Sequence, residues 1–108
     1  MPKFLVRGNY TQEGLKGLMK DGGTGRRDAV AKAVASLGGK LESIYFALGD
    51  TDVFVIADLP DATAVSAVSL AAGASGAVRI NTCQLLTPDD VDMAIAKTVN
   101  YRSPGAQS

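Results

Sequence analysis

Histidine is absent from this chain of 108 residues, and so is tryptophan. Histidine is the usual catalytic base and a common metal ligand, so its absence removes the simplest designs for acid–base catalysis, metal binding and haem ligation. Cys83 is the single cysteine, which excludes a disulfide within one chain and argues against a cysteine-based zinc site. Any catalysis would depend on carboxylates, tyrosine, arginine or lysine, and we expect no cofactor and no bound metal.

The chain also lacks a net charge, because eleven basic side chains balance eleven acidic ones. A general nucleic-acid binder needs a net-positive face, so we expect no nucleic-acid partner. No apolar run reaches the length of a signal peptide or a membrane span, so we expect a cytoplasmic protein without a membrane partner. Zero net charge makes association between copies of the chain electrostatically easy.

Length and composition fit one globular domain. Hydrophobic residues make up 46% of the chain and charged residues 20%, which is an ordinary balance. A chain of this size has room for one core, and we predict a single domain over residues 1–99. The polar stretch over residues 100–108 contains Pro104 and Gly105 and is predicted to be a flexible tail.

Turn residues and hydrophobic periodicity divide the first third of the chain into a strand and two helices. Residues 3–9 favour a strand, and Thr11 can cap the helix that follows. A second helix over residues 26–37 carries Val30, Val34 and Leu37 on one apolar stripe. The glycine-rich stretch between the two helices predicts a break or a bend.

The rest of the chain predicts two strands around a turn, a helix, a strand and a last helix. The last helix begins at Thr87, and Asp90 has the spacing of a capping box with it. Gly73 is predicted to end the preceding helix. The expected segments are residues 40–48 and 53–57 for the two strands, 61–73 for the helix, 77–86 for the strand and 87–97 for the last helix.

This order of elements is typical of the split-βαβ or ferredoxin-like fold. We predict an α+β fold with an antiparallel four-stranded sheet and helices on one face. The strand over residues 53–57 is apolar on both faces, whereas a sheet with one solvated face alternates. We therefore expect a second copy of the chain to cover the other face, in a homodimer or a higher homo-oligomer.

The segment FALGDTDVFVIADLPD resembles the signature of the GYD-domain family, with Gly49, Asp50 and Asp52 in the signature turn. YTQEGLKGL, GGTGRR and SGAVRINTCQLLTPDD also resemble stretches typical of this family, so the resemblance covers about residues 2–102. The tripeptide Gly-Tyr-Asp itself is absent, and no role of its tyrosine carries over. The resemblance implies a subunit of a dimeric α/β-barrel. It implies little about activity, because the family is largely uncharacterised and related families include both cofactor-free monooxygenases and ligand-sensing modules.

One candidate site for a small anion is the stretch GGTGRR over residues 22–27. Backbone amides at a helix N-terminus bind anions, glycine permits close approach, and Arg26 and Arg27 add positive charge. The structural alternative is that the glycines break one long helix into two and that Thr24 caps the second. The ligand-binding candidates are Gly22, Gly23, Thr24, Arg26, Arg27 and, from a strand, Tyr45.

Tyr45 and Phe46 are neighbours on a predicted strand, so they point to opposite sheet faces. One of the two should reach the space between sheet and helices, where a tyrosine could hydrogen-bond a ligand. Arg7 and Arg79 also lie on predicted strands and would need a partner or a ligand if they faced inward. Tyr10 is a further polar candidate, and surface or interface positions remain the structural alternative for all of these residues.

Asp50 and Asp52 could bind a divalent cation or act as acid and base, but turns favour aspartate and glycine, so we favour a structural role. Cys83 lies in an alternating strand and is predicted to be a small buried side chain. A nucleophilic role for Cys83 would need a base that histidine usually supplies.

Two hypotheses on function are compatible with the sequence. In the first, the protein is a homo-oligomeric ligand-binding or interaction module that holds a small anionic molecule between sheet and helices. In the second, it is a cofactor-free monooxygenase or isomerase that acts on a small aromatic or carbonyl compound. Assembly of Tyr45, Arg7 and Arg79 into one closed pocket would favour the second hypothesis. A purely structural or regulatory module is a third option, and the sequence does not decide whether the protein is an enzyme.

Overall fold

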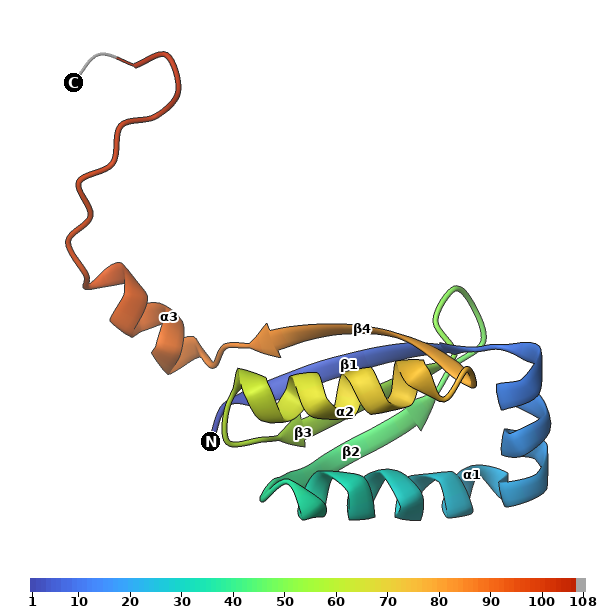
Figure 1. Ribbon diagram of the computed structural model, residues 1–108. Helices are drawn as coiled ribbons and strands as arrows, with labels where there is room; N and C mark the ends of the chain where they lie inside the picture. Colours follow the sequence, from blue (N-terminus) through green and yellow to red (C-terminus); the bar gives the residue numbers. More distant parts are fainter. Residues whose placement is uncertain (107–108) are drawn as a thin grey trace.

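The computed structural model describes residues 1–106, which form an α+β fold with a four-stranded antiparallel sheet (Figure 1). This confirms the predicted class and order of elements. The described elements are β1 (Lys3–Tyr10), α1 (Gln12–Ser36), β2 (Lys40–Phe46), β3 (Val53–Asp58), α2 (Ala62–Ala74), β4 (Val78–Leu85) and α3 (Pro88–Ile95).

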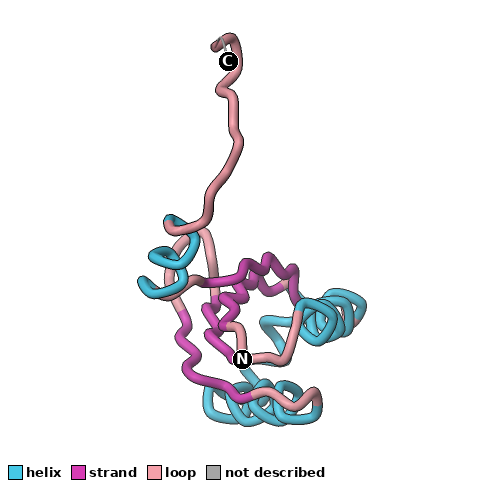
Figure 2. The backbone as a smooth tube through the Cα atoms, turned by 90° about the vertical axis from the view of Figure 1, so that its left-hand side faces the viewer, coloured by secondary structure: helices cyan, strands magenta, loops and turns pink. Residues whose placement is uncertain are grey.

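The strands lie side by side in the order β2-β3-β1-β4, and every neighbouring pair is antiparallel. This order is consistent with a ferredoxin-like fold, in which the first strand is central and two helices cross one face. Figure 2 shows α1 and α2 on the same side of the sheet. We call the opposite side of the sheet the open face.

The core lies between the sheet and these two helices. Successive strand residues point to opposite faces, so Val53, Val55 and Ala57 of β3 all point toward the helices and are buried. Phe54 and Ile56 alternate with them on the open face and are half-buried. The prediction that this strand is apolar on both faces is therefore confirmed. The other buried hydrophobic side chains are Phe4, Val6, Val34, Leu59, Val65 and Val78.

Helix α1 consists of two helical segments joined by a kink at Gly22. Gly22 has φ 76° and ψ 165°, a conformation that glycine adopts without the steric cost of a Cβ. The predicted break between two helices is confirmed. The alternative in which Thr24 caps the second segment is wrong, because the non-helical residue is Gly22 and Thr24 already lies inside the helix.

Two hydrogen bonds from Thr11 tie the start of α1 to the residues just before β4. The Thr11 amide donates to the carbonyl oxygen of Ala77 at 3.0 Å, and the Thr11 hydroxyl donates to that of Gly76 at 2.7 Å. The Thr11 hydroxyl also accepts from the Gly14 amide at 3.2 Å, which makes Thr11 the predicted N-cap. A Cβ on Gly14 would lie 1.8 Å from the Ala77 oxygen, so only glycine fits this contact.

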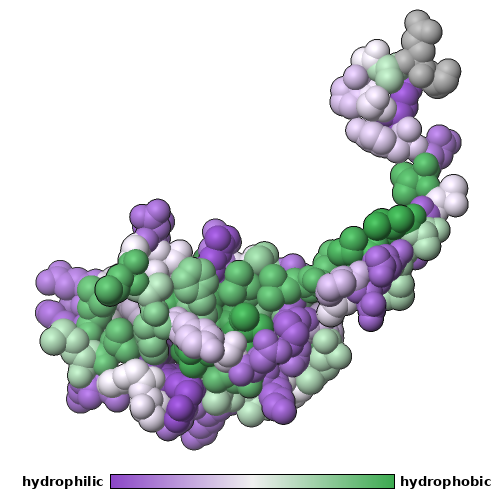
Figure 3. All heavy atoms as spheres, turned by 180° about the vertical axis from the view of Figure 1, so that it is seen from behind, coloured by the Kyte–Doolittle hydropathy of each residue, from purple (hydrophilic) through white to green (hydrophobic). Residues whose placement is uncertain are grey.

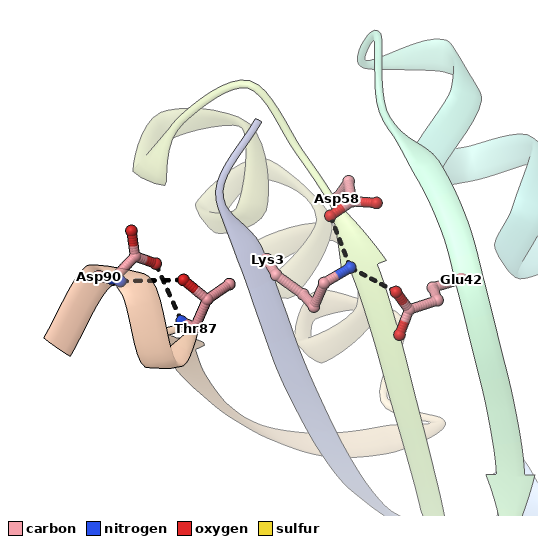
Figure 4. A network of polar contacts seen from close by, with 5 residues as sticks. All are labelled: Lys3, Glu42, Asp58, Thr87 and Asp90. Atoms are coloured by element: carbon pink, nitrogen blue, oxygen red, sulfur yellow. Dashed lines mark hydrogen bonds and ion pairs between the residues drawn. The ribbon is translucent and has the colours of Figure 1, made fainter. Parts of the chain in front are cut away.

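Lys3 joins three strands at one end of the open face. Its Nζ donates to Glu42 of β2 at 2.5 Å and to Asp58 of β3 at 2.9 Å (Figure 4). The hydrogen bond to Glu42 raises the pKa of Lys3 most, and the hydrogen bond to Asp58 raises it further, because both favour the charged ammonium. We call these three residues the ion cluster; it has one positive and two negative charges.

The predicted cap of α3 is present, and α2 also has an N-cap. Asp61 caps α2 by accepting from the Ala64 amide at 2.9 Å. Helix α2 extends one residue beyond Gly73, whose predicted role as the end of the helix is wrong; the chain turns at Gly76, with φ 77°. At α3, the Thr87 amide donates to the Asp90 carboxylate at 2.9 Å and the Asp90 amide donates to the Thr87 hydroxyl at 3.0 Å (Figure 4).

Helix α3 and residues 96–106 project beyond the end of the sheet (Figure 1). The last two residues of the predicted tail, 107–108, lie outside the described residues. No residue of α3 is buried, and the helix lies on the open-face side of the sheet, away from α1 and α2 (Figure 2). The radius of gyration is 17.4 Å, whereas a compact domain of this length has about 13 Å. No helix within residues 1–106 is long and apolar enough to cross a membrane.

Candidate functional site

A cleft of about 510 Å³ lies between the sheet and the two long helices. Small-molecule sites occupy clefts of this size, which are mostly apolar with a few polar groups. The space exists because many of the residues that face it are glycine or alanine, whose side chains are too small to fill the gap between the sheet and the helices. These small residues are Gly8, Gly14, Gly17, Ala29, Ala33, Ala57, Ala71, Ala72 and Ala77.

Tyr10 and Arg26 are the polar groups best placed to contact a ligand in this cleft. Tyr10 is the last residue of β1 and follows the period-two pattern of Phe4 and Val6, so its ring lies on the helix side of the sheet. Arg26 lies one turn beyond the kink at Gly22, where the second segment of α1 runs back along the sheet (Figure 1). The end of β1 and the second segment of α1 thus place a phenol and a guanidinium at the same cleft.

Burial raises the pKa of the Tyr10 phenol, because the phenolate would lose hydration in the cleft. The Arg26 guanidinium acts against this shift and the Asp52 carboxylate adds to it. The phenol therefore stays neutral near pH 7 and can donate a hydrogen bond. Glu13 and Asp21 also line the cleft, and neither was among the predicted site residues.

The predicted anion site at residues 22–27 does not form as one cluster. Arg26 lines the cleft, whereas Arg27 is exposed and pairs with its neighbour Asp28 at 3.4 Å. Gly22 forms the kink, and a Cβ on Gly23 would lie 3.5 Å from the ring of Phe46. Thr24 also does not line the cleft. The structure thus separates Arg26 from the other predicted members of this site.

Tyr45 does not reach the cleft. It lies on the open face opposite Phe54 and is 68% exposed. Phe46 is the member of the pair that points toward the helices, because it lies opposite the buried Val53 and near Gly23. As expected, one of the two side chains reaches the space between sheet and helices. That side chain is Phe46, and Tyr45 lies on the open face.

The signature turn positions the end of β1. Gly49 has φ 151°, and Asp52 accepts from the Tyr10 amide at 2.9 Å. The Asp52 amide in turn donates to the side chain of Asn9 at 3.1 Å. Asp50 is exposed in the same turn. Within residues 1–106, no group of three or more acidic or cysteine side chains could hold a metal ion. Asp52 instead has a structural contact, because its carboxylate accepts from the backbone amide of Tyr10.

The GYD domain family model matches residues 4–95, which is most of the chain. The chain belongs to the GYD domain family. No curated protein and no solved structure matches it significantly. The matched range contains Tyr10, Arg26 and the signature turn, so the cleft lies within the GYD domain.

The open face of the GYD domain carries a second, smaller pocket of about 290 Å³. Arg7 and Arg79 line it together with Asn9 and Asn81, because these residues face one another across β1 and β4. Tyr45 does not line it, so the closed pocket of Tyr45, Arg7 and Arg79 that would favour an oxygenase or isomerase is not formed.

Cys83 also lies on the open face of the GYD domain and is exposed, so the prediction that it is buried is wrong. Its register explains the difference. Cys83 lies opposite Leu5, and both residues point away from the helices.

Proposed function

We propose that this GYD domain is a homo-oligomeric ligand-binding module that holds a small, mainly apolar molecule with one anionic group in the cleft between sheet and helices. The observation that supports the ligand is an apolar cleft with Arg26 and Tyr10 on its wall. An arginine at an otherwise apolar surface binds a carboxylate strongly, since water competes less for the charges there.

The two polar groups suit one end of such a ligand. Arg26 offers several N–H donors in a fixed planar geometry that matches a carboxylate, and the neutral Tyr10 phenol adds one more donor. Glu13 is engaged by Lys16 at 3.7 Å, which weakens its repulsion of an anion. Between Gln12 and Asp28, four basic side chains outnumber three acidic ones, so the helix above the cleft has a small positive charge.

The open face supports the homo-oligomer. Leu5, Phe54, Ile56 and Tyr45 place apolar surface there, and the view from behind shows this surface across the sheet and continuing along α3 (Figure 3). The accessible surface of the chain is 7633 Å², whereas a compact monomer of 11.1 kDa exposes about 5,700 Å². An excess of about 1,900 Å² is more than twice the roughly 800 Å² that each partner buries in a standard interface.

Arg26 and Arg27 allow a matched test of the ligand site. Native mass spectrometry of the purified protein is expected to show a mass above that of the bare subunits, which disappears on unfolding. Arg26→Ala should lose this extra mass, because it removes the charge at the cleft, while Arg27→Ala should retain it. Equal loss in both variants, or an occupied Arg26→Ala cleft, would contradict the proposed site.

The homo-oligomer is tested separately by sedimentation at micromolar protein concentration. We expect a dimer or a higher oligomer that Phe54→Asp weakens, because a carboxylate would be buried against apolar surface. A wild-type chain that sediments as a monomer would overturn this part of the proposal and leave the ligand site standing.

A further inference from the structure

Helix α3 has an apolar side that nothing within residues 1–106 covers. Val91 and Ile95 lie one turn apart on the same side of the helix and are 44% and 75% exposed. Leu86 just before the helix is 61% exposed. Single exposed apolar residues are common on proteins, but these form a row on a projecting segment, which is typical of a surface that another protein covers.

Three carboxylates accompany this apolar row. Asp89, Asp90 and Asp92 lie within the first five residues of α3, and no basic residue lies in the helix itself. Asp90 is engaged in the capping box, whereas Asp89 and Asp92 are exposed. Asp92 adjoins Val91 in sequence and precedes Ile95 by three residues, so it flanks the apolar row.

The opposite charge lies at one corner of the open face. Arg7 and Arg79 are diagonal neighbours on β1 and β4, and no ion pair joins either of them to an acidic side chain within residues 1–106. The Arg7 Nε is buried and lacks a hydrogen-bond partner in the described part of the chain. Two guanidinium groups that line one pocket repel each other unless an anion lies between them. We call Arg7, Arg79 and their partners Asn9 and Asn81 the basic corner.

When the open faces of two copies pack against each other, the direction of the two-fold axis determines which parts of the two sheets meet. When the two-fold axis runs across the strands, the end of β4 in one copy lies over the start of β4 in the other. Arg79 is the second residue of β4 and α3 begins three residues after β4 ends, so α3 of one copy meets the basic corner of its partner. An axis along the strands would instead place α3 at the end that holds the ion cluster, whose net negative charge repels its carboxylates.

We propose that α3 of one copy docks at the basic corner of a second copy, with its carboxylates as the counter-ions of Arg7 and Arg79. This inference rests on the proposed homo-oligomer and specifies its geometry. Each copy gives one α3 and receives one, so the contact occurs twice in a dimer. The apolar row of α3 then extends the apolar surface of the open face, which Figure 3 shows as continuous with it.

Charge reversal in the full-length chain tests the inference. Arg79→Glu and Asp92→Arg should each weaken the dimer at least tenfold, because each change places like charges together at both copies of the contact. Both residues are exposed in the single chain, so neither change should alter its fold. Lys32→Glu is the control for Arg79→Glu, since it makes the same change in charge on the exposed side of α1 and should leave the dimer unaffected.

Mixing the two variants gives the decisive result. In a mixed dimer both contacts again join opposite charges, so an equimolar mixture of Arg79→Glu and Asp92→Arg should recover the wild-type dissociation constant within about threefold. The dissociation constants are measured by analytical ultracentrifugation at low and high salt, and high salt should weaken the wild-type dimer.

Several outcomes would overturn the inference. A strong wild-type dimer that neither variant affects would reject the α3 contact and leave the sheet-to-sheet oligomer standing. Two weakened variants with no recovery on mixing would show that the residues matter but do not face each other. Phosphate that binds stoichiometrically to the wild-type dimer, and not to Arg79→Glu, would show that the basic corner holds a free anion in place of α3.

Discussion

The contact between Gly14 and Ala77 leads to the most direct prediction on stability. Gly14→Ala would place a Cβ 1.8 Å from the Ala77 carbonyl oxygen, so the start of α1 has to move away from β4. Such overpacking costs about 1–3 kcal/mol, and breaking the hydrogen bond from the Thr11 amide leaves a polar group unsatisfied at about 1–3 kcal/mol. Alanine recovers about 0.5–1 kcal/mol by its higher helix propensity. We expect a net loss of about 3 kcal/mol in the free energy of unfolding, which is roughly a hundredfold change in the ratio of folded to unfolded chains.

Gly17→Ala is the matched control in the same helix. A Cβ on Gly17 would meet nothing within 4 Å, so only the gain in helix propensity remains and the variant should be more stable by about 0.5–1 kcal/mol. Urea unfolding followed by circular dichroism, at one fixed protein concentration, measures both variants. The reasoning is refuted if Gly14→Ala unfolds at the same urea concentration as the wild type, or if both variants shift in the same direction.

The other predictions concern the cleft and the alkaline limit of stability. Gly17→Leu should fill part of the cleft and abolish the ligand mass in native mass spectrometry, whereas Gly73→Leu, on a part of α2 that does not line the cleft, should retain it. Tyr10 and Lys3 both have raised pKa values, so the stability that each contributes is complete below its ordinary pKa and is lost as pH rises through its folded pKa. Urea unfolding between about pH 9 and pH 12 should show this loss in the wild type above the ordinary pKa values of 10.0 for Tyr10 and 10.5 for Lys3. Tyr10→Phe should remove the Tyr10 part and Lys3→Met the Lys3 part, and a flat profile in the wild type would contradict both.

Local signals predicted most of the fold correctly. The Thr11 and Thr87 caps and the break at Gly22 each depend on a few adjacent residues, whose side chains and backbone decide the local conformation. The predicted end of α2 at Gly73 is wrong because a glycine inside a helix lowers its stability without ending it.

The site was harder to predict, since it depends on which face meets the helices. Alternation shows that Tyr45 and Phe46 point to opposite sides of the sheet, but not which side is covered. Neighbours on a helix, such as Arg26 and Arg27, also point in different directions, and only the packing of α1 on the sheet places Arg26 at the cleft. Tyr10 was a further polar candidate, and its position on the helix side could have been predicted, because it continues the period-two pattern that begins at the buried Phe4.

The capping box of α3 has a consequence for any surface that receives this helix. Its two hydrogen bonds join residues three positions apart and involve nothing from the rest of the chain. Pro88 at the first helical position adds a backbone already restricted to helical φ. An eight-residue helix is normally unstable alone because its first turn is costly to form. Here the first turn is stabilised before contact, so a partner that binds α3 loses less conformational entropy than one that must fold it.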